Sequence, residues 1–451
     1  MQISTIKFSQ IEDRIDAEYY KPEYLEVKEK LDKSKGIKFL GDIVNVIMNG
    51  VEFRTYSLSG KPYLRVSDIK EVFMDLSDVK YIPENIEFSK NIELLGGDVL
   101  TSRSGTLGIS AIAPKAGSVI SSHLIRISPK KEINSYYLVV FLNSRCGRLQ
   151  ILQKNNGAVV PEINQPSLKS LKIPIPPQSF QQKIEKMVKE AQGKMRSADE
   201  KYIEAEEVLN KELGLEDLDL STQKTFEAKF SEAEDRFDSR YYQPKYKKII
   251  HLLKAGQRKN EFTLYDLDNI LTVKRGSLID DGYYCSTGIP YIRIKDLTYQ
   301  GIDPTDFAYI NEYQAKVGGY ETVKEGDQLL TVIGATVGKL CRAPKELDGS
   351  FFSNNISRLR LKKEFLNKID TIYLETALRS PICQSQILRN ATQTAQPKLN
   401  DAEVRNMSIP ILLQPIQQKI SSLIQESFQL RQEAKELINR AKQKVEELIE
   451  K

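Results

Sequence analysis

Residues 12–24 read EDRIDAEYYKPEY and residues 234–246 read EDRFDSRYYQPKY, so the pattern EDR-x-D-x-x-YY-x-P-x-Y occurs twice at an offset of 222. Three more pairs follow in the same order. They are KPYLRVSDIK (61–70) with IPYIRIKDLT (289–298), GGDVLTSRSGTLGISAIAPK (96–115) with EGDQLLTVIGATVGKLCRAPK (325–345), and LKIPIPPQSFQQKI (171–184) with MSIPILLQPIQQKI (407–420). The last pair has an offset of 236, and such small insertions belong in surface loops. The chain is therefore a tandem duplication of one unit.

The composition is that of a globular protein. Of the 451 residues, 40% are hydrophobic and 28% are charged, and the net charge is +5. The four cysteines form no CxxC pair and only two histidines accompany them, so we expect neither a metal site nor disulfides. The first residues, MQISTIKFSQIEDR, lack the apolar core of a signal peptide, and we expect a cytoplasmic location.

Each copy begins as a strand-rich region. Apolar residues alternate in PYLRVSDI and PYIRIKDL, and GDVLTS and GDQLLTVIG also favour strands. Gly-rich turns at residues 105–108 and 334–338 then interrupt the pattern. Segments 136–152 and 372–388 have helical periodicity, and Pro-rich segments at 173–177 and 409–415 close each globular part.

A long helix follows each Pro-rich segment. Apolar and small residues recur there at heptad positions a and d, interrupted only by Ser427 and Arg431, and the offset of 236 maps one register onto the other. We therefore expect the helices to pair with each other rather than to lie separately on their own domains. The predicted seam consists of Ile184, Val188, Ala191, Met195, Ala198, Tyr202, Ala205, Leu209, Ile420, Ile424, Ala434, Ile438, Ala441, Val445 and Leu448.

Connectivity sets the direction of this pairing. The first helix leads straight into the second domain, so the second helix has to run back along the first. The sequence predicts an α+β fold with strand-rich domains at residues 1–177 and 214–413. The helices at 178–213 and 414–451 form an antiparallel coiled coil with pseudo-twofold symmetry and act as a spacer.

Charge is distributed unevenly within each copy. Residues 66–99 contain three basic and eight acidic residues, whereas residues 100–175 contain ten basic and two acidic residues. The second copy repeats this order, with three against seven in residues 294–327 and twelve against seven in residues 330–408. A basic stretch around each Gly-rich turn is typical of a phosphate-contacting face. A solvated basic surface without a ligand would have the same charge distribution.

The ordered set of motifs resembles the specificity (S) subunits of type I restriction-modification enzymes. The openings RIDAEYYKPEY and RFDSRYYQPKY, the LRVSDI and IRIKDL strands, the two Gly-rich turns and QQKI before each long helix carry the resemblance, which covers essentially the whole chain. It implies that the strand-rich domains are target-recognition domains, each reading one half of a split DNA site. It also implies that the helices fix the distance between the halves.

The same resemblance implies partners. Two modification (M) subunits that use S-adenosylmethionine are expected on the helices, and restriction (R) subunits that use ATP and Mg add translocation and cleavage. This chain is expected to be non-catalytic, since it has no [DNS]PP[YFW] methyltransferase motif and no phosphate-binding P-loop. Two alternatives stay open: a specificity subunit of a methylation-only complex, and a two-headed scaffold that binds proteins.

Candidate base readers are polar side chains on loops of the strand-rich domains, because Arg and Lys pair with guanine and Asn and Gln with adenine. Arg65 and Arg293 occupy matching positions, which suggests a shared task such as a phosphate contact or a salt bridge within the domain. Base readers should instead differ between copies. The predicted DNA-binding residues are Arg54, Arg65, Arg103, Ser104, Thr106, His123, Asn155, Asn156, Lys274, Arg275, Arg293, Lys295, Thr336, Lys339, Asn354, Asn355, Thr392, Gln393 and Gln396.

Overall fold

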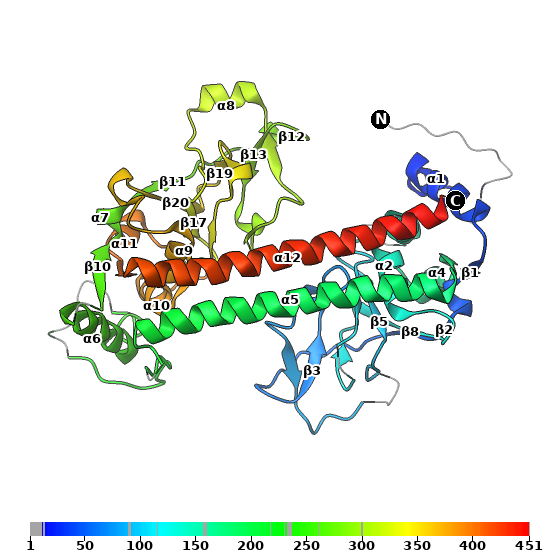
Figure 1. Cartoon of the computed structure of the whole chain (residues 1–451), viewed down its shortest axis with the longest axis horizontal. Coiled ribbons are helices and arrows are strands. Elements are labelled where there is room, and N and C mark those ends of the chain that lie inside the picture. The colour runs from blue at the N-terminus through cyan, green and yellow to red at the C-terminus, as the bar shows by residue number, and fades with distance from the viewer. Residues whose placement is uncertain are drawn as a thin grey trace. The chain divides into compact units, whose positions relative to one another are not determined.

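The structure is a computed structural model. It describes residues 11, 14–88, 92–114, 116–156, 160–216, 218–229, 231, 237–259, 261–298 and 301–450, so parts of both repeated openings lie outside the described residues. The chain divides into two compact units (Figure 1). Unit 1 comprises Met1–Ser197 with Gln429–Lys451, and unit 2 comprises Ala198–Phe428.

Unit 1 is built on two small sheets. A four-stranded antiparallel sheet has the order β2-β8-β5-β6, and a three-stranded sheet has the order β4-β3-β7. A short pair, β1 with β9, joins the start of the domain to its end. The strands are β1 (Ile37–Phe39), β2 (Val44–Asn49), β3 (Lys61–Leu64), β4 (Lys80–Ile82), β5 (Val99–Ser102), β6 (Ser110–Ile112), β7 (Val119–Ile120), β8 (Leu124–Pro129) and β9 (Lys172–Pro174).

The helices of unit 1 cover these sheets and reach the long helices. Asn134 caps α2 and Ser144 caps α3, and this second cap divides the expected single helix over 136–152 into two. Nearly every residue of α2 is buried, which explains its continuous apolar sequence. The helices are α1 (Pro22–Lys33), α2 (Ser135–Asn143), α3 (Arg145–Gln153), α4 (Gln165–Lys169) and α5 (Gln178–Glu212).

Unit 2 repeats this topology. Its four-stranded sheet has the order β11-β20-β17-β18, and β16-β13-β19 correspond to β4-β3-β7 with β12 added beside β16. The strands used for this comparison are β10 (Phe262–Asp266), β11 (Leu271–Arg275), β12 (Tyr284–Cys285), β13 (Ile289–Ile292), β16 (Ala308–Ile310), β17 (Gln328–Thr331), β18 (Leu340–Arg342), β19 (Phe351–Phe352), β20 (Ile356–Leu361) and β21 (Ser408–Leu412). β10 pairs with β21 as β1 pairs with β9.

Unit 2 also contains short elements beyond these. β14 (Leu297–Thr298) and β15 (Gly301–Ile302) pair where unit 1 has a single bridge between Ile69 and Met74, and α8 (Glu312–Gly318) follows β16. The other helices are α6 (Pro244–Arg258), α7 (Leu267–Ile270), α9 (Thr371–Arg379), α10 (Pro381–Asn390), α11 (Asp401–Arg405) and α12 (Gln414–Ile449).

Each unit contains half of each long helix, and within each unit the two halves pack together (Figure 1). In unit 2, Ser427 Oγ donates to the carbonyl of Ala198 at 2.7 Å, and Lys201 pairs with Glu426 at 3.5 Å. In unit 1, Lys194 pairs with Glu433 at 2.6 Å. The prediction of an α+β fold in which the long helices pack together is confirmed.

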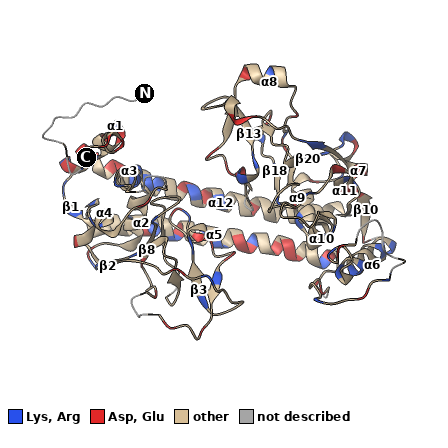
Figure 2. Cartoon of the chain, turned by 180° about the vertical axis from the view of Figure 1, so that it is seen from behind, with Lys and Arg blue, Asp and Glu red and all other residues tan. Residues whose placement is uncertain are grey.

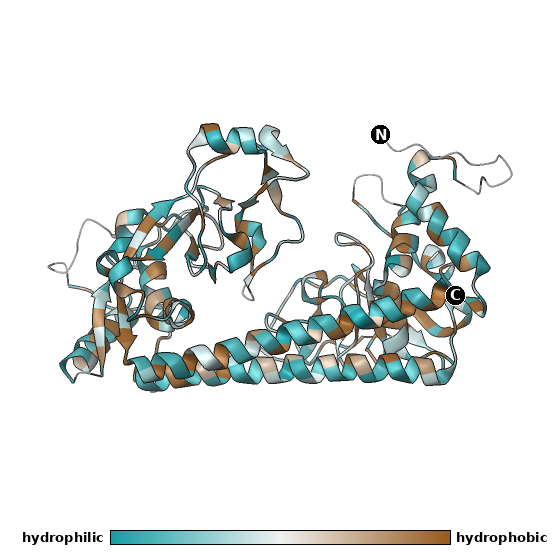
Figure 3. Ribbon diagram, turned by 45° about the horizontal axis from the view of Figure 1, so that its top comes forward, coloured by the Kyte–Doolittle hydropathy of each residue, from teal (hydrophilic) through white to brown (hydrophobic). Residues whose placement is uncertain are grey.

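Small and apolar residues form the interior of this pairing, and Figure 3 shows apolar positions recurring along both helices. Met195, Tyr202 and Leu448 of the predicted seam are partly buried. The buried seam residues are Ile184, Val188 and Ala191 with Ala434, Ile438, Ala441 and Val445 in unit 1, and Ala198, Ala205 and Leu209 with Ile420 and Ile424 in unit 2. Ser427 is also buried. Its hydroxyl donates a hydrogen bond to the Ala198 carbonyl, so the buried polar group has a partner.

A buried glutamine ties the start of each long helix to its own domain. Gln181 Oε1 accepts from the backbone N–H of Asn134 at 2.7 Å, and Gln181 Nε2 donates to the Pro176 carbonyl at 3.0 Å. In unit 2, Gln417 accepts from the backbone N–H of Asp370 and donates to the Leu412 carbonyl. The first Gln of each QQKI motif therefore has a structural role.

None of the helices formed by the described residues combines the length and apolar character required to span a bilayer.

Candidate nucleic-acid interface

A tight turn after β5 begins the candidate interface of unit 1. Ser102 Oγ donates to the Thr106 carbonyl at 2.5 Å, and the Gly108 N–H donates back to the Ser102 carbonyl at 2.9 Å. Gly108 has φ of 76°, and a Cβ there would lie 2.7 Å from Cγ2 of Ile151. Another residue would be strained at this φ, and its Cβ would displace the Ile151 side chain of α3.

The turn after β17 in unit 2 repeats this geometry. Thr331 Oγ1 donates to the Thr336 carbonyl, and the Gly338 N–H donates to the Thr331 carbonyl at 3.0 Å. Gly338 has φ of 96°, and a Cβ there would lie 2.9 Å from Oε1 of Gln384 on α10.

Two neighbouring segments are fixed to each turn by backbone bonds. In unit 1, the Arg103 N–H donates to the His123 carbonyl at 2.8 Å, and the Ile163 N–H donates to the Arg103 carbonyl at 3.0 Å. In unit 2, the Val332 N–H donates to the Asn355 carbonyl, and the Leu399 N–H donates to the Val332 carbonyl, both at 2.9 Å. We call these segments the turn frame: residues 102–108, 122–123, 155–156 and 160–163 in unit 1, and residues 331–338, 354–355 and 392–399 in unit 2.

Polar side chains of the turn frame contact one another in unit 1. Ser104 Oγ lies 2.7 Å from Nδ1 of His123, and the Arg103 guanidinium forms an ion pair with Glu162. The amide oxygen of Asn155 accepts from the backbone N–H of Glu162 at 2.8 Å. These side chains form one connected polar surface.

The loop after β2 extends this surface. Glu52 accepts a hydrogen bond of 2.8 Å from the hydroxyl of Ser122, and Arg54 donates to Glu52 at 3.0 Å. The Arg54 side chain is 86% exposed, so its guanidinium is available to an anion. Gly50 permits the close approach of the two segments, because a Cβ there would lie 2.0 Å from the Ile120 carbonyl oxygen.

The structure therefore brings most of the candidates of unit 1 together. Arg103, Ser104, Thr106 and His123 lie in the turn frame, where the exposed Thr106 occupies the turn itself. Asn155 and Asn156 lie beside Glu162, whose carbonyl accepts from the Asn156 N–H.

Unit 2 presents other side chains on the same turn frame. Asn354, Asn355 and Thr336 are partly exposed, and Thr392, Gln393 and Gln396 are exposed. The Thr392 N–H donates to the Lys398 carbonyl at 2.9 Å, which repeats the bond from Asn156 to Glu162. Gln393 also donates to Asp238.

Three basic candidates of unit 2 already have partners within the protein. Arg275 pairs with Asp401 at 2.7 Å and also donates to the Leu399 carbonyl. Lys339 Nζ donates to the Leu297 carbonyl at 2.9 Å. The Lys274 ammonium lies 3.9 Å from a Glu321 carboxylate, and its side chain is 59% exposed.

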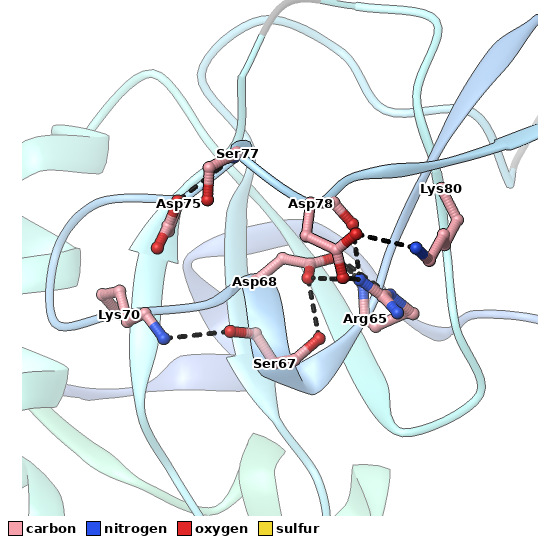
Figure 4. Close-up of polar contacts among 8 residues, drawn as sticks. All are labelled: Arg65, Ser67, Asp68, Lys70, Asp75, Ser77, Asp78 and Lys80. Atoms are coloured by element: carbon pink, nitrogen blue, oxygen red, sulfur yellow. Dashed lines mark hydrogen bonds and ion pairs between the residues drawn. The ribbon is translucent and has the colours of Figure 1, made fainter. Parts of the chain in front are cut away.

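Arg65 lies outside the turn frame, in an acidic cluster (Figure 4). It contacts Asp68 at 3.0 Å and Asp78 at 3.3 Å, and the backbone N–H of Arg65 donates to Asp68. Asp68 is buried, so the arginine neutralises a carboxylate that is removed from water. Hydrogen bonds from Lys80 and Arg65 lower the pKa of Asp78.

Unit 2 contains a matching cluster. Arg293 contacts the buried Asp296 and the Asp306 carbonyl, while Lys295 pairs with the Asp306 carboxylate. The hydrogen bond from Lys295 lowers the pKa of Asp306. The matching positions of Arg65 and Arg293 suggested a phosphate contact or a salt bridge within the domain. In both units the arginine forms a salt bridge within its own domain.

Four residues of this region were absent from the predicted set: Glu52, Ser122, Glu162 and Lys398. Glu162 and Lys398 each follow a proline, Pro161 and Pro397, that aligns between the copies, and this alignment could have identified them. The carboxylates Glu52 and Glu162 do not belong to the residue types expected to read base edges, which are basic, amide and hydroxyl side chains.

Burial removes part of the basic charge that was counted along the sequence. Arg126 is buried and pairs with the buried Asp98 at 2.7 Å, and Arg358 is also buried. Figure 2 shows basic and acidic residues following one another along both long helices. Residues 100–175 therefore expose less basic charge than their count suggests, whereas in residues 330–408 the buried Glu375 offsets the buried Arg358.

One family model matches most of the chain. A family model described as "Type I restriction modification DNA specificity domain" matches residues 32–206 and 259–447. The chain is 21% identical over 417 residues to the type I restriction enzyme MjaVIII specificity subunit of Methanocaldococcus jannaschii, covering 88% of this chain and 90% of that protein.

Solved structures with similarity include an S subunit of a type I restriction-modification system from M. genitalium. It has 13% identity and a TM-score of 0.43, and the match covers 92% of this chain and 94% of that one. The HsdS subunit from Thermoanaerobacter tengcongensis has 14% identity and a TM-score of 0.30, with 92% and 97% of the two chains covered.

Proposed function

The chain belongs to the type I restriction-modification DNA specificity family, and on that premise we propose that each of its two units reads one half of a bipartite DNA site. Members of this family are the DNA-recognition components of their enzymes. In this proposal the two turn frames face the DNA, and each supplies the side chains that select the bases of its half-site.

One observation carries the proposal: the backbone of the turn frame is repeated while its side chains change. Arg103 and Val332 make equivalent backbone bonds, yet Ser104 is replaced by Ile333 and His123 by Asn355. A scaffold that is kept while its exposed side chains differ fits two readers of different sequences. Contacts to phosphates would need no such difference.

The long helices set the spacer between the half-sites. Their buried seam is rich in alanine, which lets the helices approach closely, and the glutamines Gln181 and Gln417 fix each helix start to its domain. A rigid connection at both helix starts suits a spacer of defined length.

Catalysis belongs to partner subunits in this proposal. Two M subunits dock on the helices and carry S-adenosylmethionine, and R subunits contribute the ATP- and Mg-dependent steps. A complex of this chain with M subunits alone would already methylate DNA at the bipartite site.

Mobility-shift titrations with the M subunit present test the proposal. Binding to DNA that contains the methylated motif should weaken steeply with salt, because counterions are released from the phosphates that the protein neutralises. The same complex should bind scrambled DNA more weakly by about a thousandfold or more. Equal affinity for both DNAs would overturn the proposed reading of a DNA sequence. Binding that is absent or does not change with salt would favour a protein-binding scaffold.

A further inference from the structure

Resting on the proposed function, we propose that Glu162 and Lys398 are equivalent base-reading residues of opposite charge. Glu162 accepts a hydrogen bond from the exocyclic amino group of a cytosine or adenine in the half-site of unit 1. Lys398 donates to the O6 and N7 acceptors of a guanine in the half-site of unit 2.

The two residues occupy the same place in the turn frame. Glu162 forms a β-bridge with Ser104, and Lys398 forms the matching bridge with Ile333. The carbonyls of Glu162 and Lys398 accept from the N–H groups of Asn156 and Thr392, at 2.8 and 2.9 Å. The backbone at this position is therefore fixed in the same way in both units.

The following residues are matched as well. Asn164 caps α4 by accepting from the Ser167 N–H at 2.9 Å, and Asn400 caps α11 by accepting from the Glu403 N–H at 2.8 Å. With a proline before and a helix cap two residues after, the scaffold holds this position from both sides. The backbone at this position is therefore held by contacts that do not involve its own side chain.

The side chains at this position are accessible and are surrounded by other candidate readers. The Glu162 side chain is 42% exposed, and Lys398 is exposed. Glu162 lies beside Arg103 and the bridge partner Ser104. Lys398 has Ile333 as its bridge partner, and Ile333 follows Val332, which is bonded to Asn355.

The charge difference decides the base class. A carboxylate accepts from the N4 amino group of cytosine or the N6 amino group of adenine, while an ammonium donates to guanine. A carboxylate close to DNA phosphates is repelled, and the ion pair with Arg103 offsets this repulsion in unit 1. Lys398 is a cation that DNA phosphates attract, so no ion pair has to offset a repulsion in unit 2.

Reciprocal charge reversals test the assignment. Glu162→Lys and Lys398→Glu are made separately in the full chain, each is assembled with the M subunit, and the methylated motif is determined by sequencing a randomised DNA library. Glu162→Lys should change one base of the unit 1 half-site to guanine, with a preference of about 5- to 150-fold, the usual range for one base-specific contact. Lys398→Glu should remove a guanine preference from the other half-site.

Two further variants keep the outcome decisive. Glu162→Gln keeps an acceptor and adds a donor, so discrimination at that base should relax without a gain of guanine. Glu29→Lys, an equal charge reversal at an exposed position of α1, should leave the motif unchanged.

The outcomes separate this inference from the function on which it rests. Unchanged half-sites in both charge-reversal variants and in Glu162→Gln, with methylation that still depends on this chain, would overturn the inference and leave the proposed function intact. Methylation of any DNA sequence by the wild-type complex would overturn both.

Discussion

The side-chain oxygen of Gln181 accepts the backbone N–H of Asn134 at 2.7 Å, and this bond joins the first turn of α5 to the cap of α2. Gln417 repeats the bond with Asp370, the cap of α9, at 3.0 Å. Both glutamines are buried. In each unit, the first glutamine of the repeated motif QQKI therefore joins the long helix to its own domain. We call this contact the joint.

Replacing this joint should destabilise one unit. Gln181→Leu leaves the half-buried N–H of Asn134 and the buried Pro176 carbonyl without their partner, which costs about 1–3 kcal/mol. Urea titration followed by circular dichroism should show an earlier transition. Gln182→Leu, at the exposed neighbouring position, should change the transition little, and equal effects of the two variants would contradict the role of the joint.

Arg65 should affect stability and not base choice. Arg65→Ala leaves Asp68 buried without its cation, which destabilises unit 1 by about 3–5 kcal/mol. The methylated motif should stay the same in any folded complex, and Arg293→Ala should behave likewise. A changed base in either half-site would show that these arginines read DNA.

The four cysteines should differ in reactivity. Burial raises the pKa of Cys383 to about 12 and the pKa values of Cys146 and Cys341 to about 11, so their thiolates are scarce at neutral pH. Cys285 is the one that is partly exposed. Mass spectrometry after brief treatment with iodoacetamide at pH 7.5 should find Cys285 modified first. Earlier modification of Cys341 would contradict the packing beside β14.

The helix length should control the spacer. Inserting one heptad into both α5 and α12 lengthens each by about 10 Å, equivalent to at most about three base pairs if the helices lie along the duplex. Sequencing of methylated DNA should find both half-sites unchanged and the gap between them altered. An unchanged gap with altered half-sites would exclude the helices as the spacer.

Much of the fold could be predicted from the duplication and the heptads. Positions such as Ile184 and Ala441 recur every seven residues, and their burial follows from helix periodicity alone. The division of residues 136–152 into α2 and α3 could not be predicted in the same way, because it depends on Ser144 accepting a bond from the Gly147 N–H. Apolar periodicity continues across that break.

The side-chain pairs at the candidate interface could not be predicted from the sequence. Arg103 and Glu162 are far apart along the chain, and their ion pair follows from the tertiary path of the segment before α4. A charge count also treats Arg126 as surface, whereas the structure buries it against Asp98. Composition reports how many charges a segment has and not which of them water can reach.

The central claim is that the two units read separate half-sites, and exchanging one domain tests it most directly. Residues 38–172 are replaced by the corresponding domain of another specificity subunit, and the methylated motif is sequenced in cells that also produce the M subunit. One half-site should change to that of the donor, while the other half-site and the spacer stay the same. A change in both half-sites, or in neither, would contradict the account.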